Sequence, residues 1–260
     1  MVVQGAQVVS RVARILRIVS KHSPRGMSTA DIATQAELTR PTAHRILISL
    51  ATEGFVDHDK MLGRWVLGPE LYLMGSVAAA RYDITDLAAS SVRALARETG
   101  ESAFLTARRG DETVCLVREE GSFPLRSFVL YEGMRFPLGV ASAGLAIISY
   151  LPDDDVAAFF SRHDLKEDWG PQHSRALVMS RIDRTRQTGW ALNSGLVLAG
   201  SWGMGAAIFD AAGNPNWALS ITGVESRYGN DRQPELGRLL LNHAHEVTQK
   251  LRSRYDSSRR

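Results

Sequence analysis

Hydrophobic residues in the first 75 positions recur with the spacing of amphipathic helices. A helix predicted over 8–22 carries an apolar stripe at i, i+3, i+4 and i+7: Val9, Val12, Ala13 and Leu16. Pro24 and Gly26 follow this helix and break the chain. A later helix, which begins near Arg40, buries a stripe with the same spacing: Ala43, Ile46, Leu47 and Leu50.

A short helix is predicted between these two. Ser28 followed by Asp31 fits the capping pattern at a helix start, and Ile32, Ala33 and Ala36 form the inner face. After the third helix, two short strands over 55–57 and 64–67 make a hairpin that carries Lys60 and Arg64. Three helices and a hairpin, with a turn of about four residues before the third helix, predict a winged helix-turn-helix.

The outward face of the third helix has the chemistry that DNA recognition needs. It presents hydrogen-bond donors and acceptors, and the first carboxylate after the helix start is Glu53. The first 75 residues hold 9 basic and 6 acidic side chains, whereas the remainder holds 22 of each, so the whole excess of +3 lies here. The candidate DNA-binding residues are Ser28, Thr39, Arg40, Pro41, Thr42, His44, Arg45, Lys60 and Arg64.

The rest of the chain alternates between strand and helix patterns. A helix over 70–80 follows the hairpin, and another begins near Asp83 and ends at Gly100. Further helices are predicted at 142–151, from 152 onward, at 174–188 and at 233–254. Strands are predicted at 103–109, 113–119, 125–130, 190–193, 204–210 and 217–222. Strands with flanking helices indicate an α+β domain with a mostly antiparallel sheet.

The first part of the chain resembles the IclR family of bacterial transcriptional regulators. The resemblance rests on a combination of motifs: Thr42-Ala43-His44-Arg45 with Ile46-Leu47, then Leu50, Glu53-Gly54-Phe55-Val56, and Leu67-Gly68 after the hairpin. Later blocks extend it over nearly the whole chain: Thr99-Gly100-Glu101, Gly133-Met134-Arg135-Phe136-Pro137-Leu138, Ala141-Ser142-Ala143-Gly144, Ala206-Ala207-Ile208-Phe209-Asp210 and Leu219-Ser220-Ile221-Thr222-Gly223.

This resemblance implies a domain plan and partners. It implies a winged helix-turn-helix domain over 1–68, a linker helix over 69–82 and a GAF-like effector-binding domain over 83–260. It also implies a homodimer or a dimer of dimers, and control by a small organic effector. One recognition helix covers only a few base pairs, so a palindromic operator with two half-sites about 34–36 Å apart is expected.

Two departures from the family pattern bear on the effector. Leu145 stands where the family often has Lys, and the segment 194–200 lacks the acidic residue that many members carry. A more apolar pocket favours a larger effector that is partly hydrophobic or aromatic, with a carboxylate suited to the start of the helix at Ser142. The candidate effector-binding residues are Leu125, Ser142, Ala143, Met204, Ala207, Ser220 and Thr222.

Catalytic and metal chemistry find no support in the sequence. The one cysteine, Cys115, excludes a disulfide within the chain and a cysteine-based zinc site. His243 and His245 stand at i and i+2 of a helix and face different sides. Hydrolase, phosphate-loop and dinucleotide motifs are missing from the sequence, so we expect no cofactor and no enzyme activity. Two alternatives stay open: a docking scaffold that does not bind DNA, and an enzyme with an accessory winged helix.

Composition agrees with a globular chain. Charged residues make up 23 % and the AVILMFWYC set 44 %, and no run of 18 apolar residues occurs. We therefore expect a soluble cytoplasmic protein without membrane contact.

Overall fold

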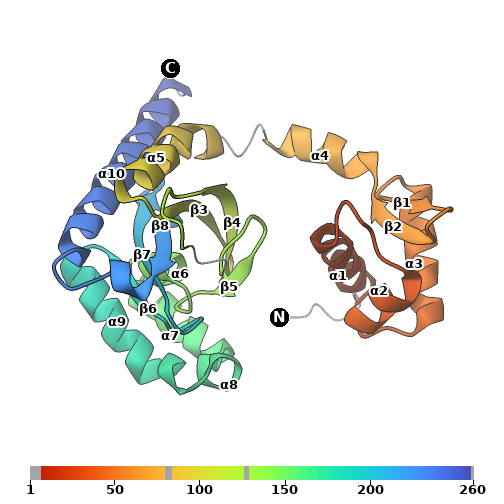
Figure 1. The fold of residues 1–260 in the computed structure, drawn as a ribbon, viewed down its shortest axis with the longest axis horizontal. Helices are drawn as coiled ribbons and strands as arrows, with labels where there is room; N and C mark the ends of the chain where they lie inside the picture. Colours follow the sequence, from red (N-terminus) through yellow and green to blue (C-terminus); the bar gives the residue numbers. More distant parts are fainter. Residues whose placement is uncertain (1–6, 80–83, 126–128, 259–260) are drawn as a thin grey trace. The chain divides into compact units, whose positions relative to one another are not determined.

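The computed structural model describes residues 7–79, 84–125 and 129–258. The chain divides into two compact units, 1–83 and 84–260. We call them the N-terminal and the C-terminal unit and describe each by itself (Figure 1). The predicted domain limits at 68 and 82 remain a prediction, because residues 80–83 lie outside the described part of the chain.

The N-terminal unit consists of three helices, a hairpin and a fourth helix. Its elements are α1 (Gln7–Lys21), α2 (Thr29–Gln35), α3 (Arg40–Thr52), β1 (Val56–Asp59), β2 (Arg64–Leu67) and α4 (Pro69–Ala79). β1 and β2 pair in antiparallel fashion, with Val56 opposite Leu67 and Asp59 opposite Arg64. The three helices and the hairpin confirm the predicted winged helix-turn-helix.

The buried face of α1 differs from the predicted one. Val9 is 69 % exposed, whereas Ile15, Ile18 and Val19 are buried against α2, α3 and the hairpin. Val12 and Leu16 are only partly buried beside this core. The helix has apolar residues on most of its circumference, so periodicity alone did not fix which stripe the rest of the unit would cover. The predicted face of α3 is confirmed, because Ala43, Leu47 and Leu50 are buried.

The C-terminal unit is built on one antiparallel sheet in the order β5-β4-β3-β8-β7-β6. The strands are β3 (Ser102–Arg109), β4 (Glu112–Glu119), β5 (Arg135–Pro137), β6 (Ala191–Ser194), β7 (Ser201–Phe209) and β8 (Pro215–Val224). The helices are α5 (Ile84–Thr99), α6 (Ser142–Ile148), α7 (Asp153–Arg162), α8 (Leu165–Trp169), α9 (Arg175–Thr188) and α10 (Gln233–Ser258). Two short 3-10 turns, η1 (Pro171–His173) and η2 (Glu225–Arg227), complete the unit.

Helices cover both faces of this sheet and create two separate cores. Helices α5 and α10 lie side by side on one face, over a core that includes Leu105, Met204 and Ile221 (Figure 1). Helices α6, α7 and α9 contribute to the core on the other face, which includes Phe104, Cys115 and Ala207. The fold class, α+β with an antiparallel sheet behind a winged helix-turn-helix, is confirmed.

The prediction of a strand over 125–130 is wrong for the part of this segment that is described. Leu125, Val129 and Leu130 are not in a strand, and residues 126–128 lie outside the described residues. The edge of β4 is instead paired with β5, where Thr113 is opposite Phe136. The apolar side chains of Val129 and Leu130 pack on the core as part of a loop, which explains their strand-like composition.

Candidate functional site

The exposed face of α3 carries most of the predicted DNA-binding residues. Arg40, Pro41, His44 and Arg45 are exposed, and Thr42 is half-buried with its hydroxyl 2.8 Å from that of Thr39. Pro41 stands in the first turn, where a missing N–H costs little. No acidic residue occurs within α3, and Arg40 and Arg45 make its first half cationic. Such a face can donate to phosphates and to base edges.

The elements around α3 hold it in place through side chains that are already bonded. The hydroxyl of Ser28 accepts from the N–H of Asp31 (3.2 Å) and donates to the Asp31 carboxylate (2.7 Å), which caps α2. Arg14 of α1 donates to the carbonyl of Ala36 at 3.0 Å and pairs with Glu37 at 3.2 Å, at the turn between α2 and α3. Ser28 therefore has a structural role, because it caps α2 of the helix-turn-helix, besides its predicted role in DNA binding.

The hairpin is fastened to the same scaffold. Trp65 is buried, its indole N–H donates to Thr29 Oγ1 at 2.9 Å, and its backbone pairs with that of Met27. Arg64 donates to the carbonyls of Arg25 (3.2 Å) and Gly26 (3.4 Å), so part of its guanidinium has a structural role. Lys60 is exposed at the start of the turn.

A cavity lies in the C-terminal unit between the sheet, the start of α6 and the loop that includes Val129 and Leu130. Its enclosed volume is about 40 Å³, and about 490 Å³ when the open space at its mouth is counted as well. Every described residue that lines it is uncharged. The lining consists of Thr106, Thr113, Cys115, Val129, Leu130, Met134, Phe136, Ala141, Ser142, Ala143, Asn193, Val197, Ser201, Trp202, Gly203, Ser220 and Thr222.

Three hydroxyls in this cavity distinguish it from an apolar void. Thr106 Oγ1, Ser220 Oγ and Thr222 Oγ1 are buried, and none of the described residues gives them a hydrogen-bond partner. Ser220 and Thr222 share one face of β8, and Thr106 projects from β3, the next strand of the sheet. A buried hydroxyl without a partner costs about 1–3 kcal/mol. The arrangement suits a ligand with its own hydrogen-bonding groups.

The start of α6 approaches the sheet closely because β7 has glycines at two facing positions. A Cβ atom at Gly205 would lie 2.9 Å from the Ser142 carbonyl oxygen, and one at Gly203 would lie 3.1 Å from Ser142 Oγ. Asn193 closes the same end of the cavity, since its amide donates to the carbonyl of Val140 at 2.7 Å. This close packing brings Ser142 and Ala143 to the cavity wall.

Four of the seven predicted effector-binding residues line this cavity, and three lie elsewhere. Met204 is completely buried on the opposite face of the sheet, because side chains alternate along β7 and its neighbours Gly203 and Gly205 face α6. Ala207 shares the face of the cavity but lies deeper in the core, outside the lining. Leu125 is 64 % exposed and does not contribute to the wall.

Most of the other residues that line the cavity were not predicted from the sequence. Thr106 is the clearest example, because the predicted strand over 103–109 contained it as the one hydroxyl in its interior. Phe136 and Trp202 were also missed, although both are bulky residues in segments that resembled the family pattern or adjoined it. A hydroxyl at an inward position of a central strand was the signal that could have identified Thr106.

Cys115 contributes a thiol to the cavity without a reactive character. Burial, and after it the Glu132 carboxylate, raise the pKa of this thiol to about 12, so the thiol stays protonated at neutral pH. It therefore acts as a small apolar wall residue.

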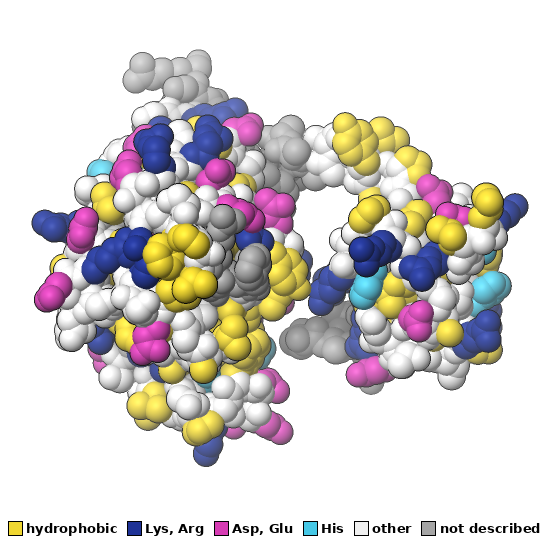
Figure 2. All heavy atoms as spheres, viewed as in Figure 1, with side chains coloured by type: hydrophobic (Ala, Val, Ile, Leu, Met, Phe, Trp, Pro, Cys, Tyr) yellow, Lys and Arg dark blue, Asp and Glu magenta, His cyan; other side chains and the backbone are white. Residues whose placement is uncertain are grey.

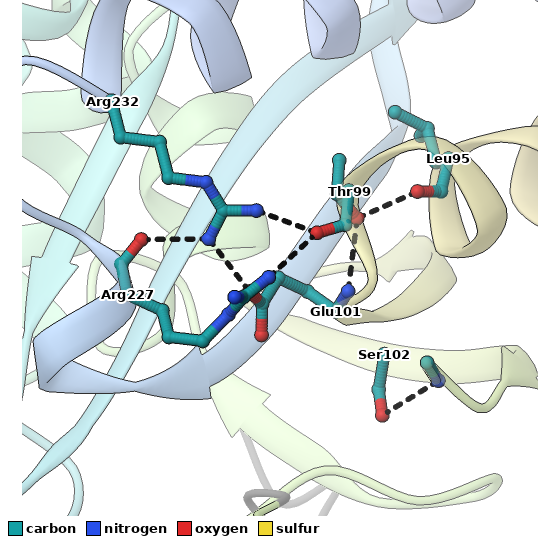
Figure 3. A network of polar contacts seen from close by, with 7 residues as sticks. Leu95, Thr99, Glu101, Ser102, Arg227 and Arg232 are labelled. Atoms are coloured by element: carbon teal, nitrogen blue, oxygen red, sulfur yellow. Dashed lines mark hydrogen bonds and ion pairs between the residues drawn. The ribbon is translucent and has the colours of Figure 1, made fainter. Parts of the chain in front are cut away.

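A network of ion pairs and hydrogen bonds surrounds buried Glu101 at the end of α5 (Figure 3). Arg227 and Arg232 both donate to Oε1 of Glu101, at 2.5 and 2.9 Å, and both donate to the carbonyl of Thr99. The side chain of Glu101 is only 1 % exposed. This network joins the end of α5 to the segment that leads into α10, and the paired position of Thr222 is Ser102, the residue after Glu101.

The described residues contain neither a cluster of metal ligands nor a helix that could span a membrane. There, no three His, Cys, Asp or Glu side chains gather in a way that would hold a metal ion. Within the same part of the chain, no helix combines the length and the apolar character needed to cross a membrane.

Family models match both units. Residues 8–60 match the IclR helix-turn-helix domain, and residues 76–249 match the model described as bacterial transcriptional regulator IclR C-terminal. Among curated proteins, the HTH-type transcriptional repressor AllR of Salmonella typhi is 26 % identical over 247 residues, which cover 94 % of this chain and 90 % of that protein. The acetate operon repressor of Salmonella typhimurium is 25 % identical and covers 93 % of this chain and 89 % of its own length.

Solved structures show the same fold. The Thermotoga maritima IclR structure has a TM-score of 0.72 and 24 % identity, and the match covers 95 % of this chain and 99 % of that one. An IclR homolog from Microbacterium hydrocarbonoxydans, complexed with 4-hydroxybenzoate, has a TM-score of 0.77 and 19 % identity over the same shares. At these identities the likeness concerns the fold alone.

Proposed function

The chain belongs to the IclR family of bacterial transcriptional regulators, and on this premise we propose which of its surfaces contact DNA and effector. Members of this family are regulators that bind DNA and small-molecule effectors, and they are not enzymes. The cytoplasm, where bacterial DNA lies, is its proposed place of action.

The DNA-contacting surface is the outward face of α3 together with the hairpin. The observation that carries this proposal is the exposed, acid-free face with Arg40, His44 and Arg45 on a helix whose other side is packed. In this arrangement Arg45 contacts a base edge, and Lys60 and Arg64 contact phosphates. The sugar-phosphate backbone of the DNA passes beside Ser28, Thr39, Pro41 and Thr42 in this arrangement.

The test is a competition binding assay with the full chain and a duplex that it selects from a random library. Arg45→Ala is expected to lose about 1–3 kcal/mol of discrimination between the selected duplex and a scrambled one. Arg97→Ala, an exposed arginine of the C-terminal unit, is the matched control and should leave discrimination unchanged. Full discrimination by Arg45→Ala would show that this side chain does not read bases.

The effector is proposed to be a small organic acid with an apolar, aromatic body. The uncharged lining supports this because Phe136, Leu130 and Trp202 offer flat or apolar contacts, while neutral donors lie near the start of α6. A carboxylate would accept hydrogen bonds from the backbone at Ser142 and Ala143 and from the hydroxyls of Ser220 and Thr222. The 4-hydroxybenzoate bound to the Microbacterium homolog is a molecule of this class.

A thermal-shift series with aromatic and aliphatic acids tests the effector assignment. Ser220→Ala with Thr222→Val should remove the shift produced by the best acid and leave DNA affinity without effector nearly unchanged. Ser180→Ala, an exposed serine of α9, is the matched control. An unchanged shift in the double variant would place the effector outside this cavity.

The proposed assembly is a homodimer, with a dimer of dimers as the larger form. Helix α4 supports it, because hydrophobic side chains gather over this helix (Figure 2). Tyr72, Met74 and Val77 are 76 %, 50 % and 78 % exposed, and Ile48 of α3 is 48 % exposed. Since α4 also connects the two units along the chain, we place the coupling between effector and DNA affinity in this helix.

A further inference from the structure

The turn of the hairpin presents two apolar side chains to solvent. Met61 is 96 % exposed and Leu62 is 68 % exposed. The backbone holds them outward, because Asp59 Oδ1 accepts hydrogen bonds from the N–H groups of Met61 (2.9 Å) and Leu62 (3.0 Å). We call Met61 and Leu62 the apolar tip.

The apolar tip stands between two cations on a fixed support. Lys60 and Arg64 flank it in the sequence and are both exposed. The carboxylate of Asp59 is turned back to the backbone of the turn, and the other acid of the hairpin, Asp57, lies toward the opposite end of β1. Buried Trp65 anchors β2 to the helices, so the tip is carried by the packed core of the unit.

We propose that the apolar tip is a wedge that enters the minor groove of DNA beside the site read by α3 and partly unstacks one base step. Met and Leu side chains flanked by cations have the chemistry of proteins that unstack and kink DNA from this groove. This inference rests on the proposed DNA contact of α3 and extends it to residues that contact neither bases nor phosphates by hydrogen bonds.

The size and charge of the tip favour DNA over a protein partner. Two side chains offer far less area than the roughly 800 Å² that each partner of a stable protein complex buries. The flanking Lys60 and Arg64 complement phosphates, which line both sides of the minor groove. The tip also belongs to the same compact unit as α3.

The experiment uses the full chain and a duplex selected from a random library, with 2-aminopurine placed in turn at the steps that flank the selected sequence. The fluorescence of 2-aminopurine rises when its stacking is lost. We compare the native chain, Met61→Ser with Leu62→Ser, and the apolar swap Met61→Leu with Leu62→Met. Both positions are exposed, so the thermal melting of the variants should match that of the native chain.

The proposal expects a rise at one flanking step with the native chain and with the apolar swap, and loss of this rise with the serine variant. Equal fluorescence for the native and serine chains, or no rise at any step, would overturn the wedge while the DNA contact of α3 stands. A serine variant that becomes monomeric in sedimentation would assign the tip to a protein contact instead. Failure to select any duplex would overturn the DNA contact itself and the wedge with it.

Discussion

The two proposed binding regions handle their polar groups in opposite ways. Around α3 the polar side chains are either exposed, as Arg45 is, or already bonded within the unit, as Ser28 is. In the cavity the hydroxyls of Thr106, Ser220 and Thr222 are buried without a partner among the described residues. A surface that meets DNA keeps its groups hydrated until contact, whereas a buried site holds groups whose partner must come from a ligand.

This difference lowers the folding stability of the C-terminal unit, which holds the cavity, but not that of the N-terminal unit. A surface face such as that of α3 loses little stability by being polar, because its groups remain in water. Each buried hydroxyl without a partner destabilises the folded state by about 1–3 kcal/mol. The C-terminal unit must therefore offset this cost with contacts elsewhere, and the hydrogen bonds of Arg227 and Arg232 to buried Glu101 are contacts of this kind.

The largest effect is expected from breaking that support. Glu101→Ala leaves Arg227 and Arg232 partly buried without their shared carboxylate, and removal of one partner from such a network costs about 3–5 kcal/mol. Urea unfolding monitored by hydrogen exchange should show this loss in the C-terminal unit, with α1 to α3 unaffected. Glu98→Ala, at a 38 % exposed carboxylate that bonds to neither Arg227 nor Arg232 within the described part of the chain, is the control. Equal stability of Glu101→Ala and the control would show that the Glu101 network does not stabilise the C-terminal unit.

A smaller effect is expected from pushing the two walls of the cavity apart. In Gly205→Ala the new methyl group would lie 2.9 Å from the Ser142 carbonyl oxygen, so α6 must shift. Overpacking of this kind costs about 1–3 kcal/mol, and the shift should also weaken the effector response.

Chemical denaturation and the thermal shift by the best acid measure both consequences of Gly205→Ala. The control is Gly75→Ala in α4, where a methyl group meets nothing within 4 Å and should stabilise the helix slightly. An unaltered effector response in Gly205→Ala would show that the position of α6 does not matter to binding.

The same contrast explains what the sequence could and could not predict. Helix α3 and its exposed face follow from local rules, since the stripe of Ala43, Leu47 and Leu50 and the first-turn Pro41 are visible in the sequence. The cavity depends on strand order and on which alternate side chains face inward. Met204, one of the predicted effector-binding residues, lies on the opposite face from the cavity, because one residue of register on β7 separates the two faces of the sheet.

Resemblance to a family also had uneven value in the two regions. It placed Ser142 and Ser220 in matching blocks, and both line the cavity. It gave no indication of Thr106, whose role depends on the pairing of β3 with β8 across more than 100 residues of chain. The buried face of α1 was predicted wrongly for a similar reason, because the residues that cover it belong to α2, α3 and the hairpin.

The smallest effects, of opposite sign, are expected from the same substitution made once in each region. Ser28→Ala removes the cap of α2, where the hydroxyl accepts from the N–H of Asp31, and should destabilise the N-terminal unit by about 1 kcal/mol. Ser220→Ala removes a buried hydroxyl that has no partner among the described residues, so it should leave the C-terminal unit unchanged or stabilise it by up to about 1 kcal/mol. Both are measured without effector by urea unfolding, with Ser180→Ala as an exposed reference. If Ser220→Ala destabilises as much as Ser28→Ala, the hydroxyl of Ser220 is satisfied within the empty protein, and the contrast between the two regions does not hold.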